Sequence, residues 1–312
     1  MSTILPPRIS TPNAMLGAYS GVINGQGEIA KLSRQASSQK IAQDLQGFGA
    51  DASRLVSTKA LEDRFERRAE TLKSLEARAE VEAAALDSLG GAVQQVRDAI
   101  GNAIANQNAA GLREALELAL ATAFNAANTT YAGESVFGGI RGYGEPTVPR
   151  TLDQLASEPD SDLAFVDTGI ARQVKLEDDR AMQLSRTADE VFRPFLDFLR
   201  QVRVWENTNA PLQGSLNAAT TNWLRTQLPG IDAVQRGVFD SQAANGTVAK
   251  QIETARLANE ARRDAFAKAV AGQENVDLAE VAAKLSAAQL QYQASASIFG
   301  QLKDLNLLQF IR

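Results

Sequence analysis

The chain has 312 residues, a length typical of about two domains and ample for a buried core. It contains no cysteine and no histidine, which excludes disulfides, thiolate nucleophiles, Cys/His metal sites and the Ser/His/Asp triad; we therefore expect no catalytic residue, cofactor or metal. The net charge of −5 makes nucleic acid an unexpected partner. Alanine occupies 53 positions and aromatic residues only 6%, a composition that favours long helices.

The N-terminal stretch Met1–Arg8 has neither the basic and apolar regions nor the cleavage site of a secretion signal. No run of residues approaches the roughly 18 apolar residues of a membrane span. We therefore expect no contact with a membrane and no cleaved signal peptide. Export by a machine that reads an uncleaved terminus stays open, and a chain without cysteine suits passage through an oxidising space.

A weak apolar stripe marks the first forty residues, where Met15, Tyr19, Val22, Ile29 and Leu32 recur at helical spacing. Such a helix has too little apolar surface to be stable by itself, so most of its stability must come from a partner. The C-terminal helix is similar in length and is also amphipathic. We expect the two termini to form a helical hairpin.

The clearest signal is the stretch Leu61–Ile100, where steps of three and four residues place apolar side chains on one stripe. A repeat of about 3.5 residues over roughly five heptads predicts a long helix that packs along a partner as in a coiled coil. Gly90 and Gly91 interrupt this helix and indicate a bend. The helical pattern then continues to about residue 128.

Glycine and proline break any helix between Asn128 and about Asp178. Short apolar runs at Ser135–Phe137 and Leu163–Val166 predict strands joined by turns. We expect a small β-containing insert that faces outward and has few contacts with the helices; its own fold is not defined by the sequence. Helix returns at about Ala181.

Two features of this region imitate functional motifs. Asp160 and Asp162 form an acidic pair, but they lack the ligand spacing of a calcium loop and a convergent partner. The glycines near Gly138 lack the Gly-Lys-Ser/Thr ending of a phosphate-binding loop. Solvated loops and tight turns are the better interpretations.

The stretch Leu216–Val270 has a seven-residue apolar grid, which polar residues such as Ser241 and Asn245 interrupt. Asp277 is well placed as the N-cap of a last helix, with Glu280 at capping-box spacing. In that helix apolar residues step by three and four without a slip. The residues predicted to form its stripe are Leu278, Val281, Leu285, Tyr292, Phe299, Leu302, Leu305 and Leu308.

Long helices from both chain ends with an insert between them predict a mainly α fold, an elongated bundle of coiled-coil-like helices with a small β-containing insert (α+β). We expect residues 1–45 and 275–312 to form the terminal hairpin. Residues 46–130 and 180–274 form a domain of long helices, and residues 131–179 form the insert.

Three stretches carry a resemblance to the bacterial flagellin superfamily. Asn275–Phe299 and the leucines after it are similar to the family's acidic start, its Gln-Ala-Ser stretch and its leucine-rich ending. Val93–Ile100 resembles the Gln-Arg-x-Arg-Glu-Leu helix. Asn128–Gly139 resembles the turn with which the hook-associated, hook–filament junction proteins enter their β region. Gln39 replaces the usual glycine, a departure that weakens an assignment to filament flagellin in particular.

The resemblance implies a structural, non-enzymatic subunit of the extracellular bacterial flagellum that joins hook to filament by head-to-tail helical assembly. It places the last helix in an inner tube, and Gln94, Gln95 and Arg97 on a helix surface that faces a neighbouring subunit. The implied partners are copies of the chain, a neighbouring hook-associated protein, flagellin, the type III export apparatus and an export chaperone.

Other interpretations stay open at this point. Periodicity alone suits a core helix of an ordinary bundle as well as an inner-tube helix, and Gln94, Gln95 and Arg97 suit a solvated helix face. A filament flagellin is the alternative within the superfamily, and a soluble helical adaptor or enzyme is the alternative from another class. Sedimentation and electron microscopy of concentrated protein discriminate assembly from these.

Overall fold

The structure is a computed structural model that describes residues 11–166, 170–177 and 180–310. Its α-helices are α1 (Thr11–Ser38), α2 (Ala52–Asn106), α3 (Leu112–Ala127), α4 (Leu152–Ser157), α5 (Ala188–Thr208), α6 (Ala218–Glu274) and α7 (Leu278–Phe310). The strands are β1 (Thr130–Tyr131), β2 (Glu134–Ser135), β3 (Gln173–Glu177) and β4 (Arg180–Gln183). Short 3-10 helices are η1 (Gln46–Asp51), η2 (Gly139–Arg141) and η3 (Asp162–Ala164).

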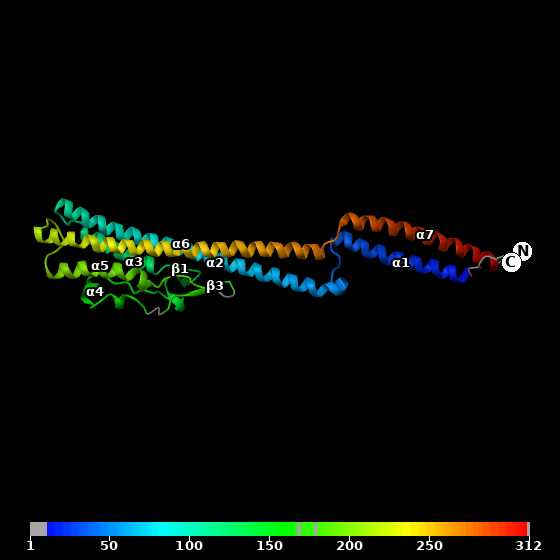
Figure 1. The fold of residues 1–312 in the computed structure, drawn as a ribbon, viewed down its shortest axis with the longest axis horizontal. Helices are drawn as coiled ribbons and strands as arrows, with labels where there is room; N and C mark the ends of the chain where they lie inside the picture. Colours follow the sequence, from blue (N-terminus) through cyan, green and yellow to red (C-terminus); the bar gives the residue numbers. More distant parts are fainter. Residues whose placement is uncertain (1–10, 167–169, 178–179, 311–312) are drawn as a thin grey trace. The chain divides into compact units, whose positions relative to one another are not determined.

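Long helices dominate the described residues, and the strands form two antiparallel pairs, β1 with β2 and β3 with β4 (Figure 1). The predicted fold class, mainly α with a small β-containing insert, is therefore confirmed. Gly90 and Gly91 do not interrupt α2, which is helical throughout its length. Gly90 is buried, and a Cβ atom there would lie 3.6 Å from Val238 Cγ1, an ordinary packing distance.

The chain divides into two compact units. The terminal unit combines Met1–Phe65 with Ala261–Arg312, and the central unit is Glu66–Glu260. The helices α2 and α6 contribute residues to both units.

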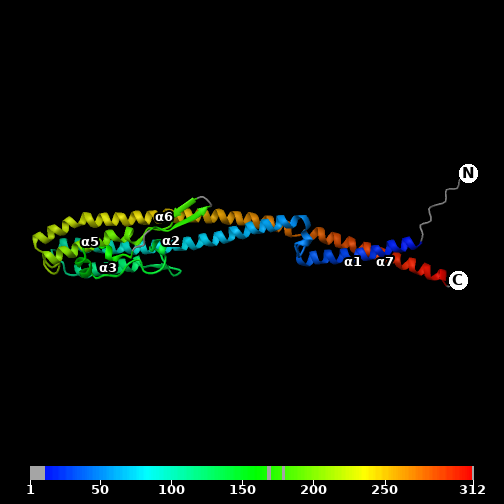
Figure 2. The same cartoon turned by 90° about the horizontal axis from the view of Figure 1, so that it is seen from below.

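In the central unit, α2 and α6 lie side by side and run antiparallel (Figure 2). Arg97 Nε on α2 donates a hydrogen bond of 2.6 Å to Asp232 Oδ1 on α6. Asn245 Nδ2 on α6 donates one of 2.9 Å to the carbonyl oxygen of Ala79. These contacts fix which residues of the two helices face each other.

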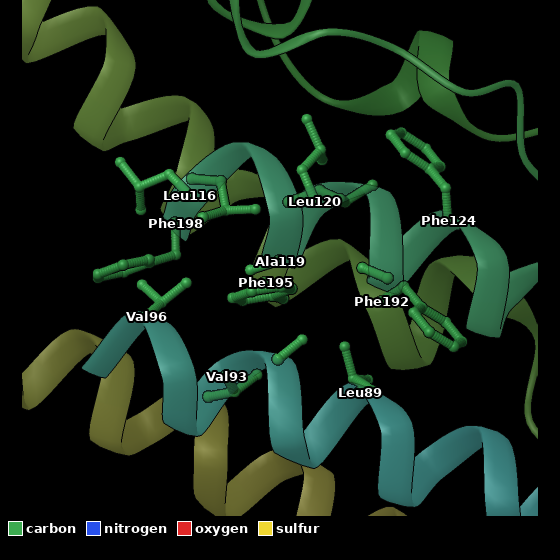
Figure 3. Close-up of a cluster of buried hydrophobic side chains, with 14 of the residues drawn as sticks. Leu89, Val93, Val96, Leu116, Ala119, Leu120, Phe124, Phe192, Phe195 and Phe198 are labelled. Carbon is green, nitrogen blue, oxygen red and sulfur yellow. The ribbon is translucent and has the colours of Figure 1, made fainter. Parts of the chain in front are cut away.

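The core of the central unit lies where α2, α3 and α5 meet. Figure 3 shows Phe195 of α5 between Val93 of α2 and Ala119 of α3, with Leu116 of α3 to one side and Phe192 of α5 to the other. All five side chains are buried. Complete burial of a large apolar side chain contributes about 1.5–3 kcal/mol, so this layer is the main source of stability in the unit.

The insert belongs to this same core. The Phe137 ring packs edge-on against Phe192 of α5, with ring centroids 5.1 Å apart, and Leu155 of α4 is completely buried in the same cluster. Phe165 is half-buried against it. The expectation that the insert has few contacts with the helices is therefore wrong, because its apolar side chains complete the main core.

The strands lie elsewhere than predicted. Only Ser135 of the run Ser135–Phe137 is in a strand, and Leu163–Val166 forms η3 and a single bridge from Phe165 to Thr147. The strand β4 occupies the segment after Ala181 where helix was expected. The helix α5 begins later, where the Glu190 carboxylate accepts a hydrogen bond of 3.2 Å from the Thr187 backbone N–H.

A buried arginine ties the insert to α2. Arg78 Nη2 donates hydrogen bonds to the carbonyl oxygens of Ser135, at 2.9 Å, and Val136, at 2.8 Å. Glu134 lies 3.8 Å from Arg78 Nη1 and also pairs with Arg172. The turn after β2 is thus held by a side chain of the long helix.

A second polar network joins α3, α4 and α5. The Glu206 carboxylate accepts hydrogen bonds from Arg113, at 2.6 Å, and Arg203, at 2.5 Å, and Arg203 also pairs with Asp153. Burial acts to raise the pKa of Glu206, but the hydrogen bonds from the two arginines outweigh it and hold that pKa below its usual value. Glu206 therefore stays ionised in this buried position.

Candidate assembly interface

The two terminal helices form an antiparallel hairpin in the terminal unit, and they lie side by side in both views (Figures 1 and 2). The Tyr19 and Phe299 rings lie 5.8 Å apart between their centroids, and Gln26 Nε2 donates a hydrogen bond of 3.2 Å to Tyr292 Oη. A Cβ atom at Gly25 would lie 3.3 Å from Tyr292 Cβ. Glycine at this position therefore allows the close approach of α1 to α7.

Two backbone hydrogen bonds join the segment after α1 to the segment before α7. The Ile41 N–H donates to the carbonyl oxygen of Glu274 at 2.7 Å, and the Val276 N–H donates to that of Gln39 at 3.1 Å. The Glu274 carboxylate pairs with Lys59 and Lys40, and the hydrogen bond from Lys59 is the main cause that lowers the pKa of Glu274. These hydrogen bonds and ion pairs fix the start of α7 against the end of α1.

An N-cap sets the first turn of α7. Asp277 Oδ1 accepts hydrogen bonds from the backbone N–H groups of Ala279, at 2.8 Å, and Glu280, at 3.3 Å. The predicted cap is therefore confirmed. The Glu280 side chain pairs with Lys284, one turn along the helix.

The predicted stripe of α7 lies partly in the hairpin interface. Val281 is buried, Leu278 is exposed, and the remaining described members are half-buried. These half-buried residues are Leu285, Tyr292, Phe299 and Leu302. Tyr292 and Phe299 contact α1 of the same chain, so this stripe serves an intramolecular contact. The side chains of Leu305 and Leu308 lie outside the described part of the structure.

A different set of apolar side chains is exposed on the hairpin. Leu290 and Ile298 of α7 are 70% and 52% exposed, and Leu16 and Ile23 of α1 are 66% and 49% exposed. Leu16 and Ile23 are seven residues apart, which places them on one face of α1. Sequence reasoning missed all four residues because none of them belongs to the apolar stripes that were followed.

The sequence does hold a signal for this surface. Residues 11–27 contain no Asp, Glu, Lys or Arg, and neither do residues 285–301. The contacts of Tyr19 with Phe299 and of Gln26 with Tyr292 place these two uncharged segments side by side. A helix face exposed to water is normally rich in charged residues. We call the surface of residues 11–27 and 285–301 the uncharged face.

The three residues predicted on the helix surface are all exposed on α2. Gln94 Nε2 donates a hydrogen bond of 2.8 Å to Asp98 Oδ1, one turn along the same helix. Arg97 is paired with Asp232, and this hydrogen bond raises the pKa of Arg97. Gln94 and Arg97 thus form hydrogen bonds within the chain, and Gln95 is exposed beside them on the same helix.

A membrane-spanning helix and a metal-binding cluster are two other kinds of functional feature. No helix in the described part of the chain is long and apolar enough to cross a membrane. No group of three or more Asp and Glu residues in the same part could hold a metal ion.

No protein-family model and no curated protein matches the sequence. Two solved structures have a similar fold. A protein described as a flagellar hook-associated protein from Vibrio parahaemolyticus has a TM-score of 0.53 at 13% identity, covering 71% of this chain and 97% of its own. FlgL from Bacillus cereus has a TM-score of 0.50 at 15% identity, covering 70% of this chain and 98% of its own. The predicted resemblance to hook-associated proteins is confirmed at the level of the fold.

Proposed function

We propose that this chain is a structural subunit of the bacterial flagellum, which joins hook to filament by packing against copies of itself and against neighbouring subunits. The observation that carries the proposal is the uncharged face, a surface without charged residues that exposes large apolar side chains on a hairpin of both chain termini. The fold shared with two flagellar proteins supports the choice of the flagellum among assemblies.

The physical argument concerns the exposed leucines and isoleucines. An isolated apolar residue on a surface needs no explanation, but four of them on two adjacent uncharged helical segments favour burial by another molecule. Burying a large apolar side chain contributes about 1.5–3 kcal/mol. A patch that meets a different patch of the next copy produces open helical growth, the arrangement that a tubular assembly requires.

Within this proposal, the hairpin of residues 1–45 and 275–312 lines an inner tube. The long helices of residues 46–130 and 180–274 contact neighbouring subunits through surfaces that include Gln94, Gln95 and Arg97. Residues 131–179 face outward. In this role the chain acts by packing.

The proposed partners follow from the same role. They are a neighbouring hook-associated protein, flagellin, the type III export apparatus and an export chaperone that covers the terminal helices before assembly. The chain is then extracellular and is exported through that apparatus. The exposed apolar side chains of the uncharged face support the need for such a cover.

Deletion of the gene in the source bacterium tests the role. We expect hooks without attached filaments and flagellin monomers in the medium, both scored by electron microscopy and immunoblotting. Immunogold labelling of wild-type cells should place the chain at one narrow band between hook and filament. Labelling along the whole filament would indicate a filament flagellin, and normal filaments in the deletion strain would overturn the proposal.

A matched pair of variants tests the uncharged face. Leu290→Glu places a charge on it and should fail to restore filaments in the deletion strain. Leu163→Glu changes an exposed leucine of the insert, which the proposal places away from the subunit contacts, and should restore them. Because both side chains are exposed, circular dichroism should show both proteins folded. Restoration by Leu290→Glu would show that this face is not part of the assembly.

A further inference from the structure

The central unit contains a cavity of about 240 Å³ between α2, α6 and the segment that joins β4 to α5. Its wall is apolar on one side, where Leu184, Val191 and Val248 line it. Its other side is polar and includes Glu82, Ser185, Arg186, Ser241 and Asn245. The cavity thus has a place for an apolar group and a place for a polar one.

Three buried oxygen atoms of the lining have no hydrogen-bond partner. They are Glu82 Oε2, Ser185 Oγ and Asn245 Oδ1, and their residues are only 4%, 5% and 5% exposed. The Asn245 amide is oriented by its bond to the Ala79 carbonyl oxygen, so its oxygen points away from that bond. Unpaired buried polar atoms are uncommon in folded proteins, and one explanation for them is a bound group.

The charged groups of the cavity lining are Arg186 and Glu82. Arg186 Nη1 donates a hydrogen bond of 3.2 Å to Ser241 Oγ, and no carboxylate pairs with Arg186 in the described part of the chain. On α2, Arg78 shares the single carboxylate of Glu134 with Arg172. The residues that α5 and α6 place on the lining, including Val191, Ser241 and Asn245, are uncharged.

Glu82 does not compensate the charge of Arg186 at neutral pH. Burial raises the pKa of Glu82 to about 8, although Arg78 and Arg186 both act to lower it. The carboxyl group is therefore mostly protonated at pH 7, and a protonated carboxyl is a hydrogen-bond donor. Ser185 Oγ is a second donor, and Arg186 is a third.

We propose that this cavity binds a carboxylate with a short aliphatic chain. Arg186 provides the charged hydrogen bonds, the hydroxyl of Ser185 and the protonated carboxyl of Glu82 donate to the same anion, and Leu184, Val191 and Val248 pack against the aliphatic part. Asn245 Oδ1, which can only accept, is satisfied by a bridging water. The proposal is independent of the flagellar role, because it concerns the central unit alone.

Two sources present this chemistry: a free carboxylate of about four carbons, or the side chain of an acidic residue of another protein. Sodium butyrate serves as the probe for the first source. N-acetyl-glutamate N-methylamide, a blocked glutamate without terminal charges, serves as the probe for the second. Tighter binding of one probe identifies its source, and either result supports the carboxylate site.

The test uses the full chain with labelled valine and leucine methyl groups, titrated by NMR at pH 6.5 and pH 9.5. We expect saturable shifts of the Val191 and Val248 methyl signals at pH 6.5. Affinity should fall about tenfold or more at pH 9.5, because ionised Glu82 repels the anion and no longer donates. Glu82→Gln keeps a neutral donor, so it should bind with similar affinity at both pH values.

Arg186→Gln should lose about tenfold or more in affinity at pH 6.5. Arg225→Gln, which changes an exposed arginine on α6 that bonds Asn222, is the matched control and should bind as the wild type does. Circular dichroism checks that each variant is folded. The absence of saturable shifts in the wild type would overturn the proposal and indicate a cavity filled by water. Affinity that rises with pH and is lost in Glu82→Gln would also overturn it, since that behaviour belongs to a cation site.

Discussion

The central unit and the terminal unit use apolar residues in opposite ways. Phe195 of α5 is completely buried among side chains of α2 and α3. Leu290 of α7 is 70% exposed, and Phe299 is only half-buried against α1. The central unit therefore completes its core within one chain. The terminal hairpin leaves large apolar side chains exposed on its surface.

The largest expected effect concerns the response of the central unit to pH. The pKa of Glu82 is raised from 4.5 to about 8 by burial, so the unfolded chain loses this proton first. The free energy of unfolding should therefore fall as pH rises from about 4.5 to about 8, by an amount on the order of 5 kcal/mol, and then level off. Glu82→Gln should remove this fall, as measured by urea unfolding at pH 5, 7 and 9.

Hydrogen exchange at the same pH values shows which unit loses stability. The pH-dependent loss of protection should occur at amides of the central unit, while the protection of amides in α7 should stay unchanged. An equal fall in the wild type and in Glu82→Gln would show that other groups govern the pH response.

The next effect compares two phenylalanines, one from each unit. Phe195→Ala removes a fully buried ring and should lower the free energy of unfolding by about 3–5 kcal/mol. Phe299→Ala removes a half-buried ring from the hairpin, and we expect about 1 kcal/mol because much of that ring already contacts water. Urea unfolding of both variants, followed by circular dichroism, measures the difference. A similar cost for both would mean that the hairpin has a complete core of its own.

The smallest effect lies at the N-cap of α7. Asp277→Ala removes the acceptor for the N–H groups of Ala279 and Glu280 and should cost about 1 kcal/mol, seen as faster hydrogen exchange in the first turn of α7. Ser286→Ala is the control, because this exposed hydroxyl only bonds the carbonyl oxygen of Ala282 in its own helix. Equal exchange rates in the two variants would show that the Asp277 cap does not stabilise the first turn of α7.

The sequence predicts the long helices well because their apolar spacing persists for many turns. Val93, Val96 and Ile100 lie on the predicted stripe of α2, and all three are buried. Asp277 is the predicted cap, since a cap depends only on residues close in the sequence. Local periodicity and local hydrogen bonding are the two properties that a single sequence displays directly.

The contacts of the insert and the exposed apolar residues of the hairpin are harder to predict from the sequence. Phe137 and Leu155 join the main core through contacts with α5, which is distant in sequence, and no local pattern signals such a contact. Leu290 and Ile298 are apolar but lie away from the stripe that faces α1. Their signal is the missing charge over residues 285–301, a property visible only when the polar face of a helix is examined as carefully as its apolar face.

The guanidinium of Arg78 has a mechanical consequence when the chain is under tension. Its Nη2 atom bonds the carbonyl oxygens of Ser135 and Val136 together. A force that slides the turn along α2 loads both bonds at once, and each is charge-assisted and shielded from water. Parallel bonds under shear rupture together, which demands a higher force than breaking them in sequence. Pulling experiments on Arg78→Met should therefore detach the insert at lower force while the helices still unravel at their original force.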